Sequence, residues 1–242
     1  MTCSFNSNNL ETNFKVGNPS FSFDNYKPTI TEIPDRDGGV LTGSSLGIGT
    51  VTFDLYYQGT VAQRREALST LAKYLDVDEP KDLVLPLNSW VYKAVPNGQI
   101  KTTMGANGDI HTVTFSIMEP AYGTLRSAVV PSGGSVSITV NGTYPTMPNI
   151  ATNGAQRDTT SLLWGIKVDN GDFIHVKTGS NSARYVKINC SQRTSVLTAS
   201  LTPNMPTLDS DWFVLAPGTH TVAMDQGTCS SDTTISWYER WL

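Results

Sequence analysis

Hydrophobic and polar residues alternate one by one over much of this chain, which is the pattern of β-strands that bury one face. The clearest case opens at Val51, where Val51, Phe53, Leu55 and Tyr57 alternate with Thr52, Asp54 and Tyr56. The segment His111–Met118 repeats the pattern, with Val113, Phe115 and Ile117 on one side. These periods predict two half-buried strands in the first half of the chain.

One helix is predicted between these strands. Thr60 and Gln63 have the spacing of a capping box, in which each side chain bonds the backbone of the other residue. Spacings of three and four then give the stripe of an amphipathic helix, through Val61, Arg65, Leu68, Leu71, Ala72 and Leu75. Glu79-Pro80 ends any helix, because the residue before a proline disfavours helical angles. A strand at Leu83–Leu87 and a turn at Pro96–Gly98 follow.

The rest of the first half predicts short strands at Phe14–Val16, Phe21–Phe23 and Thr29–Ile33, with a turn-forming cluster at Asp35–Gly39. Pro131-Ser132-Gly133-Gly134 has the composition of a linker. We place a domain boundary between Tyr122 and Gly134. The expected domains are residues 1–130 and residues 131–242.

No convincing helix appears in the second half, which predicts short strands separated by turn residues. Asn170-Gly171, between two apolar runs, indicates a hairpin whose turn residues both need positive φ. Strand spacing of about eight to twelve residues favours a two-sheet β-sandwich. The expected strands are Ser135–Val140, Leu163–Val168, Phe173–Val176, Arg184–Ile188, Ser195–Leu201, Trp212–Leu215, His220–Met224 and Thr233–Tyr238. The fold class is therefore mainly β, with one amphipathic helix in the first domain.

Composition and charge narrow the function classes. Charged residues make up 16% of the chain, against about 25% in an average soluble domain, and Ser, Thr, Asn and Gly fill the difference. That mixture is common in β-rich extracellular and virion proteins. The net charge of −4 is spread over both halves without a basic face, so we expect no nucleic-acid readout. No apolar run approaches the ~20 residues of a membrane helix, and the first residues lack a secretion signal.

Candidate catalytic and metal-binding groups are few, and each has a simpler explanation. The histidines, His111, His175 and His220, fall in separate predicted strands without metal-ligand spacing. A Ser-His-Asp arrangement stays open because its members can be distant in sequence, although no Gly-x-Ser-x-Gly elbow supports one. The carboxylate pairs Asp35/Asp37, Asp169/Asp172 and Asp209/Asp211 lie in turns, where Asp commonly accepts backbone hydrogen bonds. We expect no catalytic, cofactor-binding or metal-binding residues.

Cysteine and tryptophan leave two further questions. Cys3, Cys190 and Cys229 are too few and too scattered for a disulfide framework or a zinc site, so we expect buried thiols. Exposed tryptophans on a sandwich could stack on sugar rings. Trp164, Trp212 and Trp237 adjoin apolar positions, which favours core packing, whereas Trp241 is not assigned to either role.

In chain order, several motifs resemble one known family. The motifs are Ile33–Gly39, VTFDLYY, Arg64–Leu68, Glu79–Leu83, Tyr92–Ala94 with Gly98, VTFSIMEP, Val140–Pro148, Leu215–Gly218 and Trp237–Leu242. Together they resemble the distal tail proteins of phages with long non-contractile tails, the siphovirus-type tail component. The chain departs from the family pattern at Asn88-Ser89-Trp90, where an aspartate and a proline are usual.

The resemblance implies a tail-tube-like belt domain, six copies of which close into a ring, and a galectin-like C-terminal sandwich. It also implies a place in the virion, at the distal end of the tail, after assembly in the host cytoplasm. The implied partners are the tail tube protein, the tape-measure protein and a tail-tip or tail-associated protein. No cofactor and no membrane insertion are implied.

Two other functions stay open at this point. The same sandwich could bind host cell-wall sugars through exposed aromatic residues. An enzyme such as a cell-wall hydrolase has no positive support in the sequence. The structural tail-tip protein is therefore the favoured interpretation.

Overall fold

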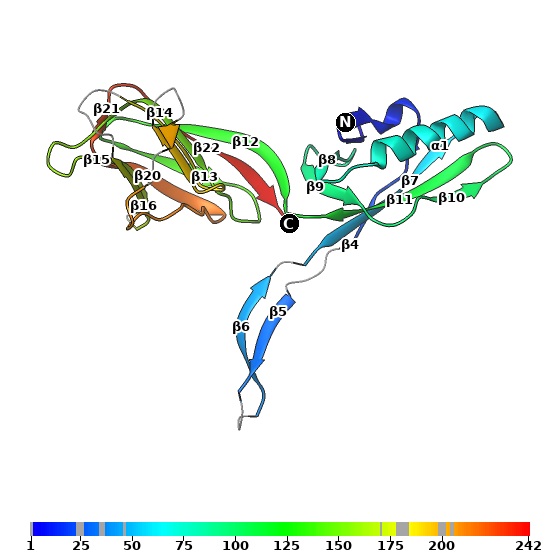
Figure 1. Cartoon of the computed structure of the whole chain (residues 1–242), viewed down its shortest axis with the longest axis horizontal. Helices are drawn as coiled ribbons and strands as arrows, with labels where there is room; N and C mark the ends of the chain where they lie inside the picture. The colour runs from blue at the N-terminus through cyan, green and yellow to red at the C-terminus, as the bar shows by residue number, and fades with distance from the viewer. Residues whose placement is uncertain are drawn as a thin grey trace. The chain divides into compact units, whose positions relative to one another are not determined.

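The computed structural model describes residues 2–22, 27–33, 37–45, 47–169, 171–177, 184–197, 202–203 and 206–242. The chain forms two compact units, Met1–Ala121 and Tyr122–Leu242. Strands dominate both units, and the described residues contain one α-helix (Figure 1). The expected mainly β fold is confirmed. Residues 122–130, which the sequence assigned to the first domain, lie in the second unit.

The first unit is built on a pair of long antiparallel strands, β7 and β11, which pair from Tyr57 opposite Asp109 to Gly49 opposite Ile117. Short strands β3 and β4 extend the sheet beyond β7. Both β10 and β9 pair with β11. The sheet continues by pairing from β9 to β8, from β8 to β1 and from β1 to β2. The elements are β1 (Ser4–Phe5), β2 (Asn8–Asn9), a 3-10 turn η1 (Leu10–Thr12), β3 (Lys15–Val16), β4 (Ser20–Ser22), β7 (Gly49–Tyr57), β8 (Lys81–Val84), β9 (Val91–Pro96), β10 (Lys101–Met104) and β11 (Asp109–Ile117).

Burial follows the alternation that predicted the two long strands. Phe53 of β7 stacks on Phe115 of β11, with ring centroids 5.7 Å apart and planes 11° apart. Phe5 of β1 packs against the same Phe115 ring at 4.8 Å. Val51 and Leu55 are also fully buried. The apolar face of the β7–β11 pair is thus the core of the first unit.

The predicted helix is present as α1 (Val61–Leu75), and its capping box is confirmed. The hydroxyl of Thr60 accepts from the Gln63 N–H at 3.4 Å, and Gln63 Oε1 accepts from the Thr60 N–H at 2.9 Å. These bonds satisfy backbone donors that a helix N-terminus otherwise leaves open.

The face that α1 buries differs from the predicted stripe. Ala67 and Leu71 are buried, whereas Val61, Arg65 and Ala72 of the stripe are exposed. Arg64 is not part of the predicted stripe. Its guanidinium lies 2.9 Å from Asp109 Oδ1 of β11 and donates to the Gly105 carbonyl at 2.8 Å, which turns the helix toward that side.

Removing the cap should have a small, local effect. We expect Thr60→Ala to lower the free energy of unfolding of the first unit by about 1 kcal/mol, because the Gln63 N–H loses its acceptor, the Thr60 hydroxyl. Ser69→Ala, at an exposed position within α1, is the matched control and should cost nothing, since alanine is the better helix former. Denaturant unfolding of both variants measures the difference. Equal stabilities for the two would contradict the role of the cap.

A separate hairpin formed by β5 (Lys27–Glu32) and β6 (Gly39–Ser45) belongs to the first unit (Figure 1). Among the described residues it is a two-stranded sheet of its own. The strand expected at Thr29–Ile33 is present, and Gly38 takes a positive φ of 84° in the turn region. Asp35 and Arg36 of the predicted turn cluster lie outside the described residues.

The second unit is a sandwich of two antiparallel sheets, as the strand spacing predicted. One sheet has the order β19-β18-β17-β14-β22-β12, with β21 beside β14, and the other has the order β13-β20-β15-β16. The strands are β12 (Ala121–Val130), β13 (Ser135–Val140), β14 (Asn149–Gln156), β15 (Leu163–Val168), β16 (Phe173–Lys177), β17 (Arg184–Asn189), β18 (Thr194–Leu197), β19 (Thr202–Pro203), β20 (Gly218–Gln226), β21 (Thr228–Cys229) and β22 (Thr233–Trp241). One apolar core joins the two sheets, with Trp164 and Ile166 from one and Ile235 and Trp237 from the other.

The structure corrects two of the segments expected in the second half. Pro131–Gly134 is a turn from one sheet of the sandwich to the other, closed by a Gly134 N–H bond to the Pro131 carbonyl at 3.0 Å, and not an interdomain linker. Trp212–Leu215 is an extended segment with a single bridge from Leu215 to Thr146. Phe213 and Leu215 of this segment are buried in the core and Val214 between them is exposed, which is the same alternation as in a strand.

The predicted β15–β16 hairpin forms, with a different turn from the one expected. The Val168 N–H donates to the Asp172 carbonyl at 2.8 Å. Among the described residues of the turn, Asp169 takes a positive φ of 52°, whereas Gly171 does not. Asn170 lies outside the described residues.

Candidate functional site: assembly surfaces and a polar pocket

The three histidines occupy structural positions. His111 is buried in β11, its Nδ1 lies 3.0 Å from the Thr102 hydroxyl, and burial lowers its pKa while Asp109 opposes that change. His175 pairs with Asp225 at 2.6 Å through Nε2. Ser210 lies against the main chain of His175, whose N–H donates to the Ser210 hydroxyl at 2.9 Å. The Ser210 hydroxyl therefore faces the backbone of His175, which is not the geometry of a nucleophile activated by an imidazole ring.

His220 is a residue of β20, and each of its two ring nitrogens lies close to a hydrogen-bond acceptor. Its Nδ1 lies 2.6 Å from Asp169 Oδ2, and its Nε2 lies 2.7 Å from the Ala216 carbonyl. Burial opposes the charged ring, yet the carbonyl and the carboxylate outweigh it and raise the pKa of His220. The Thr221 N–H, with His220, lowers the pKa of Asp169. This pair fixes the turn that follows β15.

The remaining acidic candidates also serve turns. The Thr207 hydroxyl, followed by the backbone N–H of Asp209 itself, lowers the pKa of Asp209. The Asp211 N–H donates to the Phe173 carbonyl at 2.8 Å. Across the described ranges, no cluster of three or more His, Cys, Asp or Glu side chains is arranged to hold a metal ion.

All three cysteines are buried free thiols. Burial, followed by nearby Glu11, raises the pKa of Cys3 to about 12, and burial raises the pKa of Cys190 to about 12. The indole N–H of Trp164 donates to Cys229 Sγ at 3.2 Å. The thiols are therefore part of the packing of each unit, as the sequence predicted.

The tryptophans do not form an exposed platform for sugars. Trp164 and Trp237 are buried in the sandwich core, and Trp212 is half-buried against it. Trp241 is half-buried, with its indole close to Gly123. Because Trp164 and Trp237 are buried, these four side chains do not form one exposed surface for a sugar.

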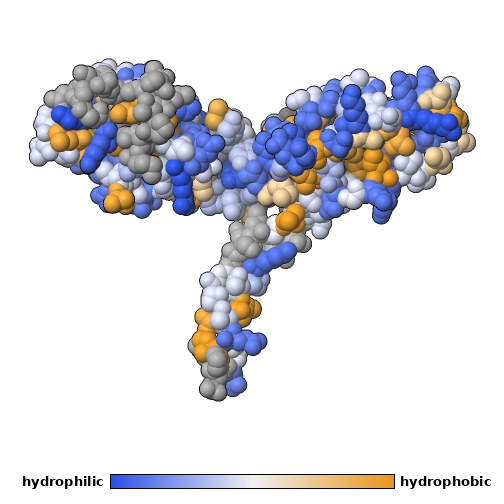
Figure 2. All heavy atoms as spheres, in the orientation of Figure 1, coloured by the Kyte–Doolittle hydropathy of each residue, from blue (hydrophilic) through white to orange (hydrophobic). Residues whose placement is uncertain are grey.

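The β5–β6 hairpin carries unburied apolar residues. Ile30 and Leu41 lie opposite each other in the register and are 61% and 64% exposed, and Ile33 nearby is 42% exposed. Hydrophobic spheres appear among hydrophilic ones along this hairpin in Figure 2. Hydroxyls bond across the strands, with Thr31 and Thr42 3.2 Å apart. Because a lone two-stranded hairpin is only marginally stable in water, this surface is suited to packing on another chain.

A second surface lies in the first unit, where the end of α1 meets the β9–β10 connection. Ala72, Leu75, Pro96 and Ile100 line an open, largely apolar hollow of about 530 Å³. Lys73 and Asp76 stand at its side. This hollow lies at the C-terminal end of α1, where Ala72 and Lys73 are exposed.

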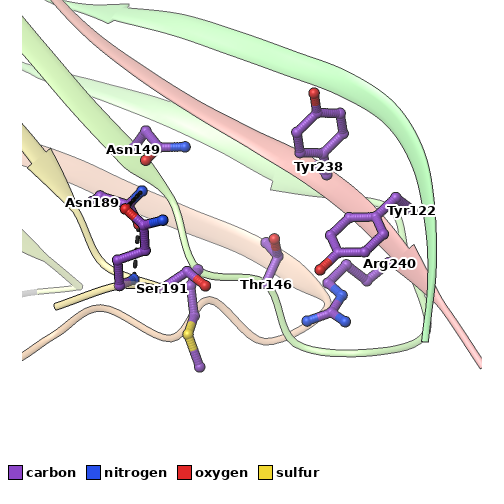
Figure 3. A pocket seen from close by; sticks show the side chains of 9 residues that line it. Tyr122, Thr146, Asn149, Asn189, Ser191, Tyr238 and Arg240 are labelled. Carbon is purple, nitrogen blue, oxygen red and sulfur yellow. Dashed lines mark hydrogen bonds between the residues drawn. The ribbon is translucent and has the colours of Figure 1, made fainter. Parts of the chain in front are cut away.

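A smaller polar pocket of about 190 Å³ lies in the second unit (Figure 3). Its walls come from the end of β22, the start of β14, the segment before β14 and the turn after β17. Arg240 of β22 lies over the Tyr122 ring, with 4.6 Å from its guanidinium carbon to the ring centroid. The sequence did not identify this pocket, because its walls are separated by more than a hundred residues.

In the described part of the chain, no helix is long and apolar enough to cross a membrane. The longest helix there is α1, which has 15 residues.

Most of the second unit resembles a known family. Residues 141–241 match the family described as siphovirus-type tail component, C-terminal domain. This part of the second unit is similar to the C-terminal domain of that family. None of the curated proteins compared matches the sequence.

Solved structures extend the likeness to the whole chain. The crystal structure of SPP1 Dit (gp 19.1), described as a paradigm of hub adsorption apparatus in phages that infect Gram-positive bacteria, superposes with a TM-score of 0.76. The match covers 100% of this chain and 99% of that chain at 20% identity. A chain of the phage p2 baseplate in its activated conformation with Sr gives a TM-score of 0.49 at 11% identity, covering 94% of this chain and 92% of that one. The chain therefore has the SPP1 Dit fold, and the resemblance drawn from the motifs is confirmed.

Proposed function

We propose that this chain is a structural protein of a phage tail, a hub subunit that forms a ring between the tail tube and the tip of the tail. The observation that carries the proposal is the agreement of the fold with SPP1 Dit over both units. The family match of residues 141–241 supports it independently, because it rests on sequence. The proposal gives the chain no catalytic role.

The first unit is the part that would form the ring. A closed ring repeats one head-to-tail interface, so each subunit needs two different surfaces that complement each other. The β5–β6 hairpin, with Ile30 and Leu41 exposed, is a suitable first surface. The neighbouring copy would bury that pair and stabilise the hairpin. We propose six copies per ring, located at the distal end of the tail in the virion and assembled in the host cytoplasm.

The ring would contact other tail proteins on its two faces. The partners we propose are the tail tube protein, the tape-measure protein and a tail-tip or tail-associated protein. The second unit would form the outer part of each subunit, in a galectin-like arrangement.

Native mass spectrometry and negative-stain electron microscopy of the full chain test the ring. We expect a hexamer, single or doubled, with no ladder of intermediate sizes at micromolar concentration. Leu41→Asp should shift the mass toward monomer, because it places a charge where an apolar contact is needed. Leu208→Asp is the matched control, since Leu208 is fully exposed in the second unit, and it should leave the hexamer intact.

Two results would contradict the proposal. One is a monomer at every concentration, including in mixtures with the adjoining tail proteins. The other is a Leu41→Asp variant that assembles as well as Leu208→Asp. That result would contradict the role of the hairpin in the interface, whereas the mass of the assembly would still test the ring.

A further inference from the structure

The outer edge of β13 has no partner strand within the described part of the chain. β13 ends the four-stranded sheet of the second unit, and β20 pairs with its inner edge. The pairing is regular and runs from Ser135 opposite Ala223 to Val140 opposite Gly218 without a bulge. A strand of these six residues is about 20 Å long. An edge of this kind is a template on which another strand can pair.

The sequence of β13 lacks the features that usually protect a sheet edge. Proteins prevent pairing at edges with charged side chains, prolines and bulges. The strand reads Ser-Val-Ser-Ile-Thr-Val, which contains no charged residue and no proline. Hydroxyl side chains occupy its exposed face, at Ser135, Ser137 and Thr139. The composition of β13 therefore favours pairing with a further strand.

The strand at the opposite end of the same sheet is covered by the chain itself. Residues 206–211 follow the outer edge of β16. The Thr207 N–H donates to the His175 carbonyl at 2.9 Å. The Asp211 N–H donates to the Phe173 carbonyl at 2.8 Å. Among the described residues, one end of the sheet is thus closed and the other, at β13, is open.

Alternate residues of β13 present their backbone groups at the open edge. The Met224 N–H donates to the Gly134 carbonyl at 3.0 Å, which fixes the phase of the pairing with β20. In an antiparallel pair, the residues that bond to the neighbouring strand recur at every second position. The even-numbered residues of β13 therefore direct their N–H and C=O groups toward β20. The odd-numbered residues, Ser135, Ser137 and Thr139, direct theirs outward.

A second copy of β13 matches this edge. When two copies pair antiparallel about Ser137, that residue lies opposite itself and Ser135 lies opposite Thr139. Every outward N–H and C=O of these residues then has a partner. On the core side, half-buried Val136 lies opposite Ile138, so the apolar faces of the two sandwiches continue into each other. No like charges meet along the strands, because β13 is uncharged.

We propose that the second unit pairs with the second unit of another copy through β13, in an antiparallel two-fold contact that makes one continuous sheet. Both copies use the same surface, so the contact is isologous. It is separate from the proposed ring interface, which lies in the first unit, and it goes beyond the hub function. A covalent link between two β13 strands can be measured whether or not a ring forms, so the two proposals can fail separately.

Cysteine cross-linking of the full chain tests the contact. Ser137→Cys places two thiols opposite each other, with Cα atoms about 5.5 Å apart, which is within reach of a disulfide. After air oxidation, we expect most of the chain to migrate as a covalent dimer on a non-reducing denaturing gel. The native cysteines are buried and should not contribute.

Ser135→Cys is the matched control. In the proposed register the two copies of this residue lie more than about 10 Å apart, so the variant should stay monomeric on the same gel. Thr139→Cys alone should also stay monomeric. A mixture of the two variants should form a covalent dimer, because Ser135 lies opposite Thr139.

Ser137→Lys tests the contact without a cross-link. Like charges directly opposite each other destabilise a pair of strands. In the Leu41→Asp background, where we expect the ring to dissociate, sedimentation should show dimers, and adding Ser137→Lys should lower the dimer affinity at least about fivefold. Thr221→Lys is the matched control, since Thr221 is exposed on β20 beside Ser137, and the affinity should stay within about twofold. Circular dichroism reports the folding of each variant.

Three results would overturn the proposal. They are the absence of a covalent dimer with Ser137→Cys, equal cross-linking of Ser137→Cys and Ser135→Cys, and an unchanged dimer affinity in folded Ser137→Lys. A Ser137→Cys dimer in a chain that forms no ring would support this contact and contradict the ring.

Discussion

Leu71→Asp is expected to unfold the first unit. Leu71 is fully buried on the face of α1 that packs on the sheet. The substitution removes a buried leucine, worth about 2–5 kcal/mol on its own, and places a carboxylate in an apolar site without a partner. The combined cost should exceed about 5 kcal/mol, which is comparable to the whole stability of many domains. Calorimetry or denaturant unfolding of the full chain should show the first unit's transition lost.

Ala72→Asp is the control one residue away. Ala72 is exposed, although the sequence pattern placed it on the same stripe as Leu71. We expect the first unit to keep its stability within about 0.5 kcal/mol, because a surface substitution away from caps and pairs has little effect. Equal destabilisation of the two variants would contradict the orientation of α1 in which Leu71 is buried and Ala72 is exposed. If Ala72→Asp folds and fails to assemble, the exposed face of α1 belongs to an interface.

Trp164→Ala is expected to have the largest effect on the second unit. Trp164 is fully buried between the two sheets, and its indole N–H donates to Cys229 Sγ. Truncation leaves a large cavity, at a cost of about 3–5 kcal/mol. The midpoint of denaturant unfolding of the second unit should fall accordingly, while the first unit's transition stays in place.

Trp212→Ala provides the comparison within the same core. Trp212 is only half-buried, on the segment that bridges to Thr146 through Leu215. The neighbours of a half-buried ring can relax into the space, so its loss should be clearly smaller. A larger destabilisation from Trp212→Ala than from Trp164→Ala would mean that the sandwich core is centred elsewhere.

Local sequence patterns predicted two kinds of element: those stabilised by contacts between residues close in sequence, and strands that bury only one face. The capping box of Thr60 and Gln63 acts within four residues, and the alternation of β7 and β11 follows from a single buried face. β14 was missed because its sequence, NIATNGAQ, is polar. It is a strand because β17 and β22 pair with its two edges, and those contacts come from far along the chain.

The orientation of α1 and the polar pocket could not be predicted from local patterns, because both depend on contacts between residues far apart in the sequence. The orientation of α1 follows from the Arg64–Asp109 pair, 45 residues apart, and a hydropathy pattern does not predict an arginine that faces the sheet. Arg240 and Tyr122 meet across the whole second unit to form the pocket. The family resemblance was accessible because motif order is a property of the sequence alone.

The place of β22 in the second unit has a consequence for biosynthesis. This strand lies between β14 and β12 in its sheet and contributes Ile235 and Trp237 to the core. The sandwich therefore cannot close until the ribosome has released residues 233–241, whereas every strand of the first unit has been made long before. Because domains fold as units in the order of synthesis, the first unit should fold during translation. The open second unit is then the species most exposed to aggregation and to chaperone binding.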